Sequence, residues 1–200
     1  GLWRLDLASG RSAAVQPVAP GLTDQRIMVL ARGAAGEFWV GTRNGLNRLD
    51  PVSNGVVRYP AGTAQSQGLS GGFVSALLLD VEGRLWVGSY GGGIDVLPAP
   101  GGGEAMRRLG VAQGLPDATV NALLQDRQGR VWVSTDDGLA RIDTDSMTIH
   151  ALRRAEGVVF STYWTGAAAR TARGELLFGG AGGMTVVLPE RLQAWSYRPQ

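Results

Sequence analysis

The side chains of this chain that could do chemistry stand in short loops between repeated strand-like runs. They combine a guanidinium, an amide, two adjacent carboxylates and three kinds of aromatic ring: Arg43, Asn44, Tyr90, Asp136, Asp137, Phe160, Tyr163 and Trp164. A guanidinium can hold a carboxylate or a sulfate through parallel hydrogen bonds, and an aromatic face can stack on a sugar ring. The set predicts a binding surface for a small molecule or a saccharide. The alternative for each single residue is an ordinary loop tip.

Residue types that support catalysis or metal binding are scarce. His150 is the only histidine, expected on an outer strand, and the chain has no cysteine, so a histidine-based or thiolate metal site is unsupported. Asp136 and Asp137 could form a cation site, but adjacent residues of a hairpin usually point apart. No nucleophile elbow or phosphate loop is present. We expect no catalytic residue, no metal and no cofactor.

Charge and hydropathy exclude two further classes of function. All 19 basic residues are arginine, the net charge is only +2, and the arginines are scattered along the chain. Nucleic-acid binding needs basic charge gathered on one face, so no nucleic-acid partner is expected. No apolar run approaches the roughly 20 residues of a membrane span, so this segment should make no membrane contact.

The elements that must position the candidate residues are repeats. Gly36–Thr42 reads GEFWVGT, Gly83–Gly88 reads GRLWVG, Gly129–Thr135 reads GRVWVST and Gly174–Gly180 reads GELLFGG. Their opening glycines lie 47, 46 and 45 residues apart. A period in the forties with four short strands per repeat is the pattern of a β-propeller blade. The sequence therefore predicts an all-β fold of four-stranded antiparallel blades.

The period divides the chain into parts of unequal length. Gly1–Asp6, reading GLWRLD, matches the second half of a repeat. The expected parts are the last two strands of a blade over 1–20, blades over 21–67, 68–113 and 114–157, a final degraded blade over 158–192, and an exit linker to a downstream domain over 193–200. One incomplete blade at each end does not make a closed circle. Because propellers close to remove exposed edges, we expect a piece of a larger ring, with seven blades.

Two residue types should be structural. The second-strand tryptophans Trp39, Trp86 and Trp132 are expected to fill the gaps between adjacent blades, and the last repeat has Leu177 in their place. Asp6, Asp50 and Asp143 each follow the third strand, where an aspartate can accept backbone N–H bonds and set a tight turn.

The repeated string resembles a known family. D-x-x-G-x-[LVF]-W-V-[GS]-[TS]-x-x-G-L-x-R-[LI]-D stands at Asp126–Asp143 and, with variations, at Gly36–Asp50 and Asp80–Val96. With G-L-P-D at Gly114–Asp117, this is similar to the two-component-regulator propeller repeat, which builds periplasmic sensors of bacterial hybrid histidine kinases and of some membrane-bound diguanylate cyclases. The resemblance covers about residues 1–192, and the weak fourth repeat leaves the closure geometry open.

The resemblance implies a non-catalytic, periplasmic, ligand-sensing segment of a signal-transduction receptor, dimeric as a whole. Its partners would be the remaining blades of the parent chain, or a second copy, and a small molecule or saccharide. Two alternatives stay open. One is a propeller lyase of the streptogramin-lyase type, for which His150 is badly placed, and the other is a purely structural interaction propeller.

Overall fold

The computed structural model describes residues 1–62, 68–99 and 105–191. These residues form five antiparallel sheets in which strands adjacent in sequence are neighbours in the sheet. The N-terminal hairpin consists of β1 (Trp3–Leu5) and β2 (Ser12–Ala14). The segment over 193–200, expected to be an exit linker, lies outside the described residues.

The other four sheets are the blades of the fold. The first blade is β3 (Ile27–Arg32), β4 (Phe38–Thr42), β5 (Gly45–Leu49) and β6 (Val56–Tyr59). The second blade is β7 (Val74–Leu79), β8 (Leu85–Ser89), β9 (Gly93–Leu97) and β10 (Arg107–Leu109). The third blade is β11 (Val120–Gln125), β12 (Val131–Thr135), β13 (Gly138–Asp143) and β14 (Thr148–Leu152). The fourth blade is β15 (Tyr163–Arg170), β16 (Leu176–Gly180) and β17 (Gly183–Val187).

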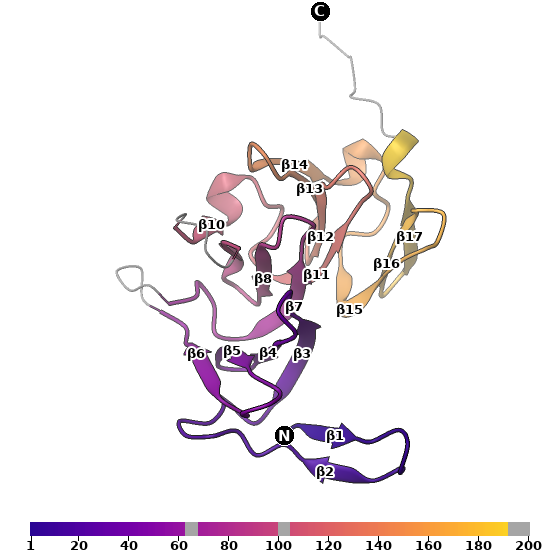
Figure 1. Ribbon diagram of the computed structural model, residues 1–200. Helices are drawn as coiled ribbons and strands as arrows, with labels where there is room; N and C mark the ends of the chain where they lie inside the picture. The colour runs from indigo at the N-terminus through magenta and orange to yellow at the C-terminus, as the bar shows by residue number, and fades with distance from the viewer. Residues whose placement is uncertain (63–67, 100–104, 192–200) are drawn as a thin grey trace, which may run out of the picture.

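The blades follow one another in an arc (Figure 1). Their first strands β3, β7, β11 and β15 lie side by side in chain order. This arrangement confirms the predicted class, an all-β run of propeller blades that does not close into a ring. The seven-bladed ring stays a prediction. Three 3-10 turns, Val111–Gln113, Arg154–Glu156 and Pro189–Arg191, complete the described elements, and none of the helices in the described part is long and apolar enough to cross a membrane.

Each blade has two ends, which we call the loop end and the turn end. The loop end carries the loops between second and third strands, at 43–44, 90–92, 136–137 and 181–182, and the segments that lead into the first strands. The turn end carries the tight turns between first and second strands and those between third and fourth strands. All the candidate binding residues of the sequence come from elements at the loop end.

A repeated glycine joins neighbouring blades at the loop end. The backbone N–H groups of Gly45, Gly93 and Gly138, the first residues of the third strands, donate to carbonyls of the next blade's leading loop at 2.7, 2.8 and 2.6 Å. All three have positive φ, and an added Cβ would lie within 2.8 Å of a backbone oxygen. Only glycine takes this conformation without strain and allows the close approach.

Tryptophans fill the junctions between blades. Each one shares a hydrophobic cluster with residues of the following blade, because blades pack face to face. Trp39 clusters with Leu85 and Leu97. Trp86 clusters with Val131 and Ile142, and Trp132 with Leu176 and Val187.

A buried carboxylate holds each of two tryptophans at the turn end. Oδ2 of Asp126 accepts hydrogen bonds from Nε1 of Trp132 at 2.8 Å and from Nε of Arg130 at 2.7 Å. Oδ1 accepts two backbone N–H bonds of the same turn. Asp80 binds Trp86 and Arg84 with the same geometry. The aspartate of D-x-x-G-R-x-W thus fixes the turn, the arginine and the indole together.

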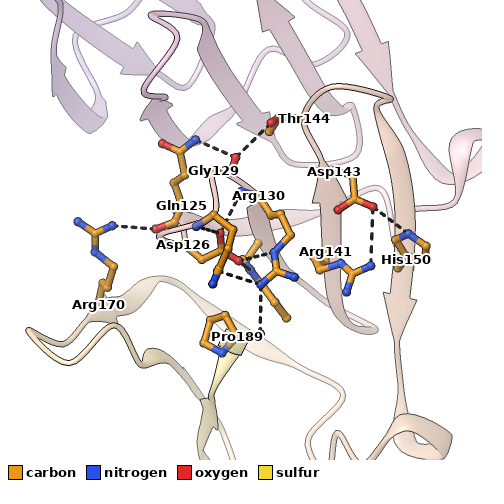
Figure 2. A network of polar contacts seen from close by, with 12 residues as sticks. Gln125, Asp126, Gly129, Arg130, Arg141, Asp143, Thr144, His150, Arg170 and Pro189 are labelled. Atoms are coloured by element: carbon orange, nitrogen blue, oxygen red, sulfur yellow. Dashed lines mark hydrogen bonds and ion pairs between the residues drawn. The ribbon is translucent and has the colours of Figure 1, made fainter. Parts of the chain in front are cut away.

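The arginines of these turns donate hydrogen bonds to the next blade (Figure 2). Nη2 of Arg130 donates to the carbonyl of Pro189 at 3.1 Å, and Nη1 of Arg84 donates to that of Thr144 at 3.1 Å. At the other end, Arg58, Arg108 and Arg153 donate to carbonyls of the segments that lead into their own blades' first strands. Arginine thus connects two neighbouring pairs of blades and also braces single blades, since a planar guanidinium presents several donors in fixed directions.

The aspartates that follow the third strand do not all play one role. Asp6 and Asp50 accept backbone N–H bonds from residues two and three positions on, as expected for turn residues. The expectation for Asp143 is wrong. It is the last residue of β13, and its Oδ2 lies 3.1 Å from Nε2 of His150 and 3.7 Å from Nη2 of Arg141 (Figure 2). The tight turn starts one residue later, so the Asp143 carboxylate faces the outer strand.

The first strand of the fourth blade departs from the other three. In β3, β7 and β11, one extra residue interrupts the register with the second strand. In β15, Tyr163 faces Gly180 and Ala168 faces Phe178, so the four residues 164–167 stand opposite Gly179 alone. Gly166 has a φ of +71° within this wide bulge. The bulge carries backbone and side chains toward the other blades at the loop end.

Candidate ligand-binding site at the loop end

An aromatic stack joins the first two blades at the loop end. The guanidinium carbon of Arg43, in the β4–β5 loop, lies 5.4 Å from the ring centroid of Phe73. The ring of Phe73 stacks on Tyr90, of the β8–β9 loop, with centroids 4.4 Å apart and planes 5° apart. The cation and the second ring both lie against the faces of the Phe73 ring, where cation–π and stacking contacts are made. Two loops and the segment before β7 therefore present one layered surface.

A chain of hydrogen bonds continues from this stack across the third and fourth blades. The hydroxyl of Tyr90 bonds to that of Thr165 in the β15 bulge. The hydroxyl of Thr165 donates to Oδ1 of Asn121 at 3.1 Å, and Nδ2 of Asn121 donates to Oδ1 of Asp136 at 2.8 Å. Side chains of the second, third and fourth blades are thus connected in one network, in which Asn121 is buried and Asp136 is exposed.

The exposed members of this surface have the chemistry of a binding site. Tyr90 is 42% exposed, and Trp164, beside Thr165 in the bulge, is 61% exposed. Arg43 and Asn44 are also exposed. The N–H of Asn44 donates to Thr42 Oγ1 at 3.1 Å, which holds the tip of the loop. Open aromatic faces, a guanidinium and a carboxylate are groups that can stack on a ring and bind its polar substituents.

The two adjacent aspartates serve different partners. Asp136 accepts from Asn121, whereas Oδ2 of Asp137 lies 3.1 Å from Nε of Arg153, at the end of the outer strand. Their carboxylates therefore do not act as a pair. Among the described residues, no three His, Cys, Asp or Glu side chains are grouped as a metal ion requires.

Two of the aromatic candidates are packing residues. Tyr163 is 2% exposed, its hydroxyl bonds to Thr185 at 2.8 Å, and its ring meets Phe178 edge-on. Burial raises the pKa of Tyr163, and the bond from Thr185 opposes that rise. Phe160 packs on the β16–β17 loop, where a Cβ added to Gly182 would lie 2.6 Å from its ring. The expectation that Tyr163 lines an open loop is therefore corrected: it belongs to the core of the fourth blade.

Sequence reasoning missed three members of the network, Phe73, Asn121 and Thr165. Phe73 stands directly before a strand-like run, where an aromatic ring looks like core. Asn121 sits at the register shift of β11. The one available signal was Asn121 itself, a polar amide inside an otherwise apolar first strand. Nothing in the sequence revealed the wide bulge that brings Thr165 to Tyr90.

A charged pair lies beside this surface in the first blade. Asp24 accepts from Nη2 of Arg26 at 2.7 Å and also from the Arg26 backbone N–H at 2.7 Å. The Arg26 side chain, followed by its backbone N–H, lowers the pKa of Asp24 to about 2. Asp24 therefore stays ionised and already has its partner.

The histidine lies elsewhere. His150 is on β14, the outermost strand of the third blade, as predicted, and its Nε2 faces Asp143. The network at the loop end comes from the first and second strands and their loops. The only imidazole of the chain is therefore separated from the candidate site by the width of the sheet.

Comparison with known proteins supports the interpretation of the repeats. Residues 68–91 and 114–137 match the family model described as Two component regulator propeller. No curated protein matches the chain.

Several solved structures share its fold. The extracellular domain of the putative hybrid two component system BT3049 from B. thetaiotaomicron matches with a TM-score of 0.79 and 20% identity, over 93% of this chain and 25% of that chain. The corresponding domain of BT4673 from the same organism matches with a TM-score of 0.68 and 22% identity, over 85% and 24%. The present chain thus spans about a quarter of the length of these structures.

An enzyme also shares the fold, with lower structural similarity. A catalytically inactive histidine-to-alanine variant of virginiamycin B lyase from Staphylococcus aureus, with quinupristin, matches with a TM-score of 0.58 and 13% identity, over 84% of this chain and 58% of that chain. Identities this low establish the common fold only. The repeat match is more specific, and it falls on the second and third blades, where the Asp–Arg–Trp turn is complete. Residues 68–91 and 114–137 of this chain are therefore repeats of the two-component regulator propeller family.

Proposed function

We propose that this chain is part of a non-catalytic, ligand-sensing propeller of a bacterial signal-transduction receptor, a histidine kinase or a diguanylate cyclase. The observation that carries the proposal is the connected surface at the loop end. It runs from Arg43 through Phe73 and Tyr90 to Thr165, and so joins the first, second and fourth blades. Two extracellular domains of putative hybrid two component systems share this fold, which supports the assignment to a receptor and a periplasmic location.

The ligand class follows from the exposed groups of that surface. Tyr90 and Trp164 offer open aromatic faces, and the Arg43 guanidinium faces solvent above Phe73. A sugar ring stacks on such faces, and a carboxylate or sulfate substituent would pair with the guanidinium. The proposed ligand is a saccharide, with an acidic one bound more tightly than its neutral counterpart.

The network also offers a route from ligand to fold. A ligand that stacks on Tyr90 competes with Phe73 or changes the direction of the tyrosine hydroxyl toward Thr165. Because Thr165 lies in the β15 bulge, a change in that bond acts directly on the first strand of the fourth blade. A ligand shifts such an equilibrium only through different affinities for the two arrangements. We propose that the fourth blade passes the change to a downstream output domain of a dimeric receptor.

A lyase of the streptogramin type is the second candidate, favoured only by the shared fold with virginiamycin B lyase. That protein is described as inactive when one histidine is replaced. In the present chain, His150 lies on an outer strand and pairs with Asp143. A structural interaction propeller without a small ligand is the third candidate.

Thermal unfolding in the presence of neutral, uronic-acid-containing and sulfated oligosaccharides tests the proposal. A ligand at one hundred times its Kd stabilises the folded state by about 2.7 kcal/mol, so one chemical class should raise the melting temperature by several degrees. Stabilisation by none of the sugars, or equally by all, would contradict ligand sensing. Hydrolysis or elimination of a cyclic lactone would instead favour the enzyme.

Matched variants localise the binding. Arg43→Ala should remove the preference for acidic sugars, and Tyr90→Ala should abolish the shift for all sugars. Tyr90→Phe keeps the stacking face but loses the bond to Thr165, so it should still bind. Val52→Ala is the control, because Val52 is exposed at the turn end between β5 and β6.

A further inference from the structure

Four side chains at the loop end form a chain of hydrogen bonds that has a direction. The hydroxyl of Tyr90 bonds to that of Thr165. Thr165 bonds to Oδ1 of Asn121 at 3.1 Å, and Nδ2 of Asn121 bonds to Oδ1 of Asp136 at 2.8 Å. Each link needs one donor and one acceptor, so the position of one proton determines the positions of the others. The direction of the chain therefore decides which hydrogen-bonding groups this surface presents to a ligand.

The charged member of the chain, Asp136, sets this direction. A carboxylate accepts hydrogen bonds and donates none, so the part of the Asn121 amide that faces it must be the NH2 group. The opposite orientation of the amide would bring two acceptor oxygens together at a contact of 2.8 Å. Asn121 is only 2% exposed, so water offers little compensation for such a contact. The orientation of the Asn121 amide therefore follows from the charge of Asp136.

The same reasoning extends from the amide to the tyrosine. The amide oxygen of Asn121 can only accept, so the Thr165 hydroxyl gives its single proton to that oxygen. Thr165 then has only lone pairs left for Tyr90, and the tyrosine must be the donor of the bond between the two hydroxyls. Because a tyrosine has one hydroxyl proton, the Tyr90 oxygen presents only lone pairs to a ligand.

The amide that relays this effect distinguishes the third blade from the first two. The extra residue at the register shift of the first strand is Met28, Ser75 or Asn121 in these three blades. Met28 has no strong hydrogen-bonding group, and the Ser75 hydroxyl donates to the carbonyl of Val120 at 2.5 Å. Of the three residues, only Asn121 accepts at one atom and donates at another. The chain is therefore a property of particular repeats and not of the propeller fold.

We propose that Asp136 is a positioning residue that keeps the Tyr90 oxygen an acceptor only, through the amide and the hydroxyl between them. The site then selects a ligand with a hydrogen-bond donor at Tyr90, a consequence that rests on the proposed function. The favoured saccharide has its carboxylate or sulfate at Arg43 and a free hydroxyl or amino group at Tyr90. An ether, an ester or a sulfate at Tyr90 is disfavoured, because it would place acceptors against the lone pairs of the tyrosine oxygen.

Raman spectroscopy of the chain tests the direction without any ligand. The intensity ratio of the tyrosine Fermi doublet is low for a phenol that donates a strong hydrogen bond and high for one that only accepts. Subtracting the spectrum of Tyr90→Phe from that of the native chain isolates the contribution of Tyr90. We expect the low ratio of a donor, and the high ratio of an acceptor would overturn the proposal.

Two neighbouring aspartates separate the positioning role from the loss of a charge. Asp136→Ala and Asp137→Ala each remove one carboxylate from the same exposed loop, but Asp137 faces Arg153 at 3.1 Å. Asp136→Ala frees the Asn121 amide to take both orientations, so the doublet ratio of Tyr90 should rise. Asp137→Ala should leave that ratio unchanged. No rise in Asp136→Ala, or an equal rise in both variants, would contradict the role given to Asp136.

The selection of a donor is tested with methyl β-glucuronide and its mono-O-methyl ethers, in which one hydroxyl at a time becomes an acceptor only. In NMR titrations, one ether should bind the native chain and Asp137→Ala about tenfold more weakly than the parent sugar, as expected for one lost hydrogen bond. The same ether and the parent sugar should bind Asp136→Ala about equally. A difference that persists in Asp136→Ala is steric and would overturn the selection. If no glucuronide binds while the Raman ratio is that of a donor, the proposed ligand class is wrong and the positioning role of Asp136 stands.

Discussion

The indole nitrogen of Trp132 donates a 2.8 Å hydrogen bond to Oδ2 of Asp126, six positions earlier in the chain. Trp86 and Asp80 repeat this relationship at the same spacing and distance. The aspartate lies before the turn and the tryptophan after it, so the bond ties two strands together where the chain reverses. A buried indole usually needs such a partner. The spacing D-x-x-G-R-x-W therefore allows this bond to form in the second and third blades.

Removing the Asp126 carboxylate should lower the free energy of unfolding strongly. Asp126 is fully buried and binds Trp132, Arg130 and the turn amides, so Asp126→Ala leaves several buried donors without acceptors. We expect the free energy of unfolding to fall by about 3 to 5 kcal/mol, as for other broken buried pairs. Urea unfolding measures it, with Asp145→Ala, at an exposed turn position, as the control. Equal midpoints for the two variants would contradict the role given to Asp126.

The first blade lacks this bond and can be given it. Gly33 occupies the position of Asp80, since its N–H donates to the carbonyl of Glu37 at 2.8 Å as that of Asp80 does to Arg84. A Cβ on Gly33 would lie 2.2 Å from Cδ of Glu37, so Glu37 must change as well. Gly33→Asp with Glu37→Arg should raise the free energy of unfolding by about 1 kcal/mol through a new acceptor for Trp39.

Single substitutions complete that experiment. Gly33→Asp alone should destabilise the protein, because two carboxylates would meet at one place. Thermal unfolding of the two single variants and the double variant measures the coupling. Additive effects would show that the two positions do not cooperate as the second and third blades imply.

A buried tryptophan, Trp132, and an exposed one, Trp164, make a matched pair for testing the packing between blades. Trp132→Ala removes a ring that is enclosed between the third and fourth blades, and it should lower the free energy of unfolding by about 3 to 5 kcal/mol. Trp164→Ala removes a ring of the same size that projects from the β15 bulge, and it should change stability by less than about 0.5 kcal/mol. Urea unfolding distinguishes them, and a large loss for Trp164→Ala would show that its ring is packed.

One buried acid should make stability depend on pH in an unusual direction. Burial raises the pKa of Asp95 above its ordinary value of 3.8, against the opposing bonds from Ser70 and the charge of Arg108. The raised pKa means that folding favours the protonated form. The stabilising contribution is complete below 3.8 and is lost as the pH rises through the pKa of the folded state. At neutral pH, where Asp95 is charged, the folded state is therefore less stable than it would be with a neutral side chain at this position.

Asn47 shows how the chain avoids that cost in the first blade. It stands at the equivalent place in β5, accepts the N–H of Thr23 at 2.9 Å, and donates to the carbonyl of Val40 at 3.1 Å. We expect Asp95→Asn to raise the urea midpoint at pH 7 and to leave it unchanged below the ordinary carboxyl pKa. Asp50→Asn is the control of opposite sign, because the N–H groups of Ser53 and Val52 lower the pKa of Asp50.

The fold class was accessible from the sequence because its determinants are local and repeated. The glycine turns, the alternation of short strands and the tryptophan at one position recur with a fixed period. Each copy of the repeat points to the same arrangement of strands, so a weak signal in one copy is supported by clearer signals in the others. The outer strand with His150 was predicted in the same way.

The site was accessible only in part, because its contacts join residues that no repeat relates. Tyr90 meets Thr165 at a separation of 75 residues, through a bulge that is wider in the fourth blade than in the other three. Tyr163 looked like a loop residue because the insertion shifts the first strand, and the register places it in the core. Asp143 was misassigned for a related reason, since the turn after β13 starts one residue later than its homologous positions imply.

The seams between blades place their arginine donors on main-chain oxygens, as Arg84 does with Thr144 and Arg130 does with Pro189. Every amino acid supplies that oxygen, so the receiving turn can mutate without loss of the contact. Sequence change is thus tolerated on the receiving side of these two seams and restricted on the arginine side. Duplicated units of this kind can be exchanged or recombined with little need for matched changes, which is how an array of repeats can lengthen and still hold together.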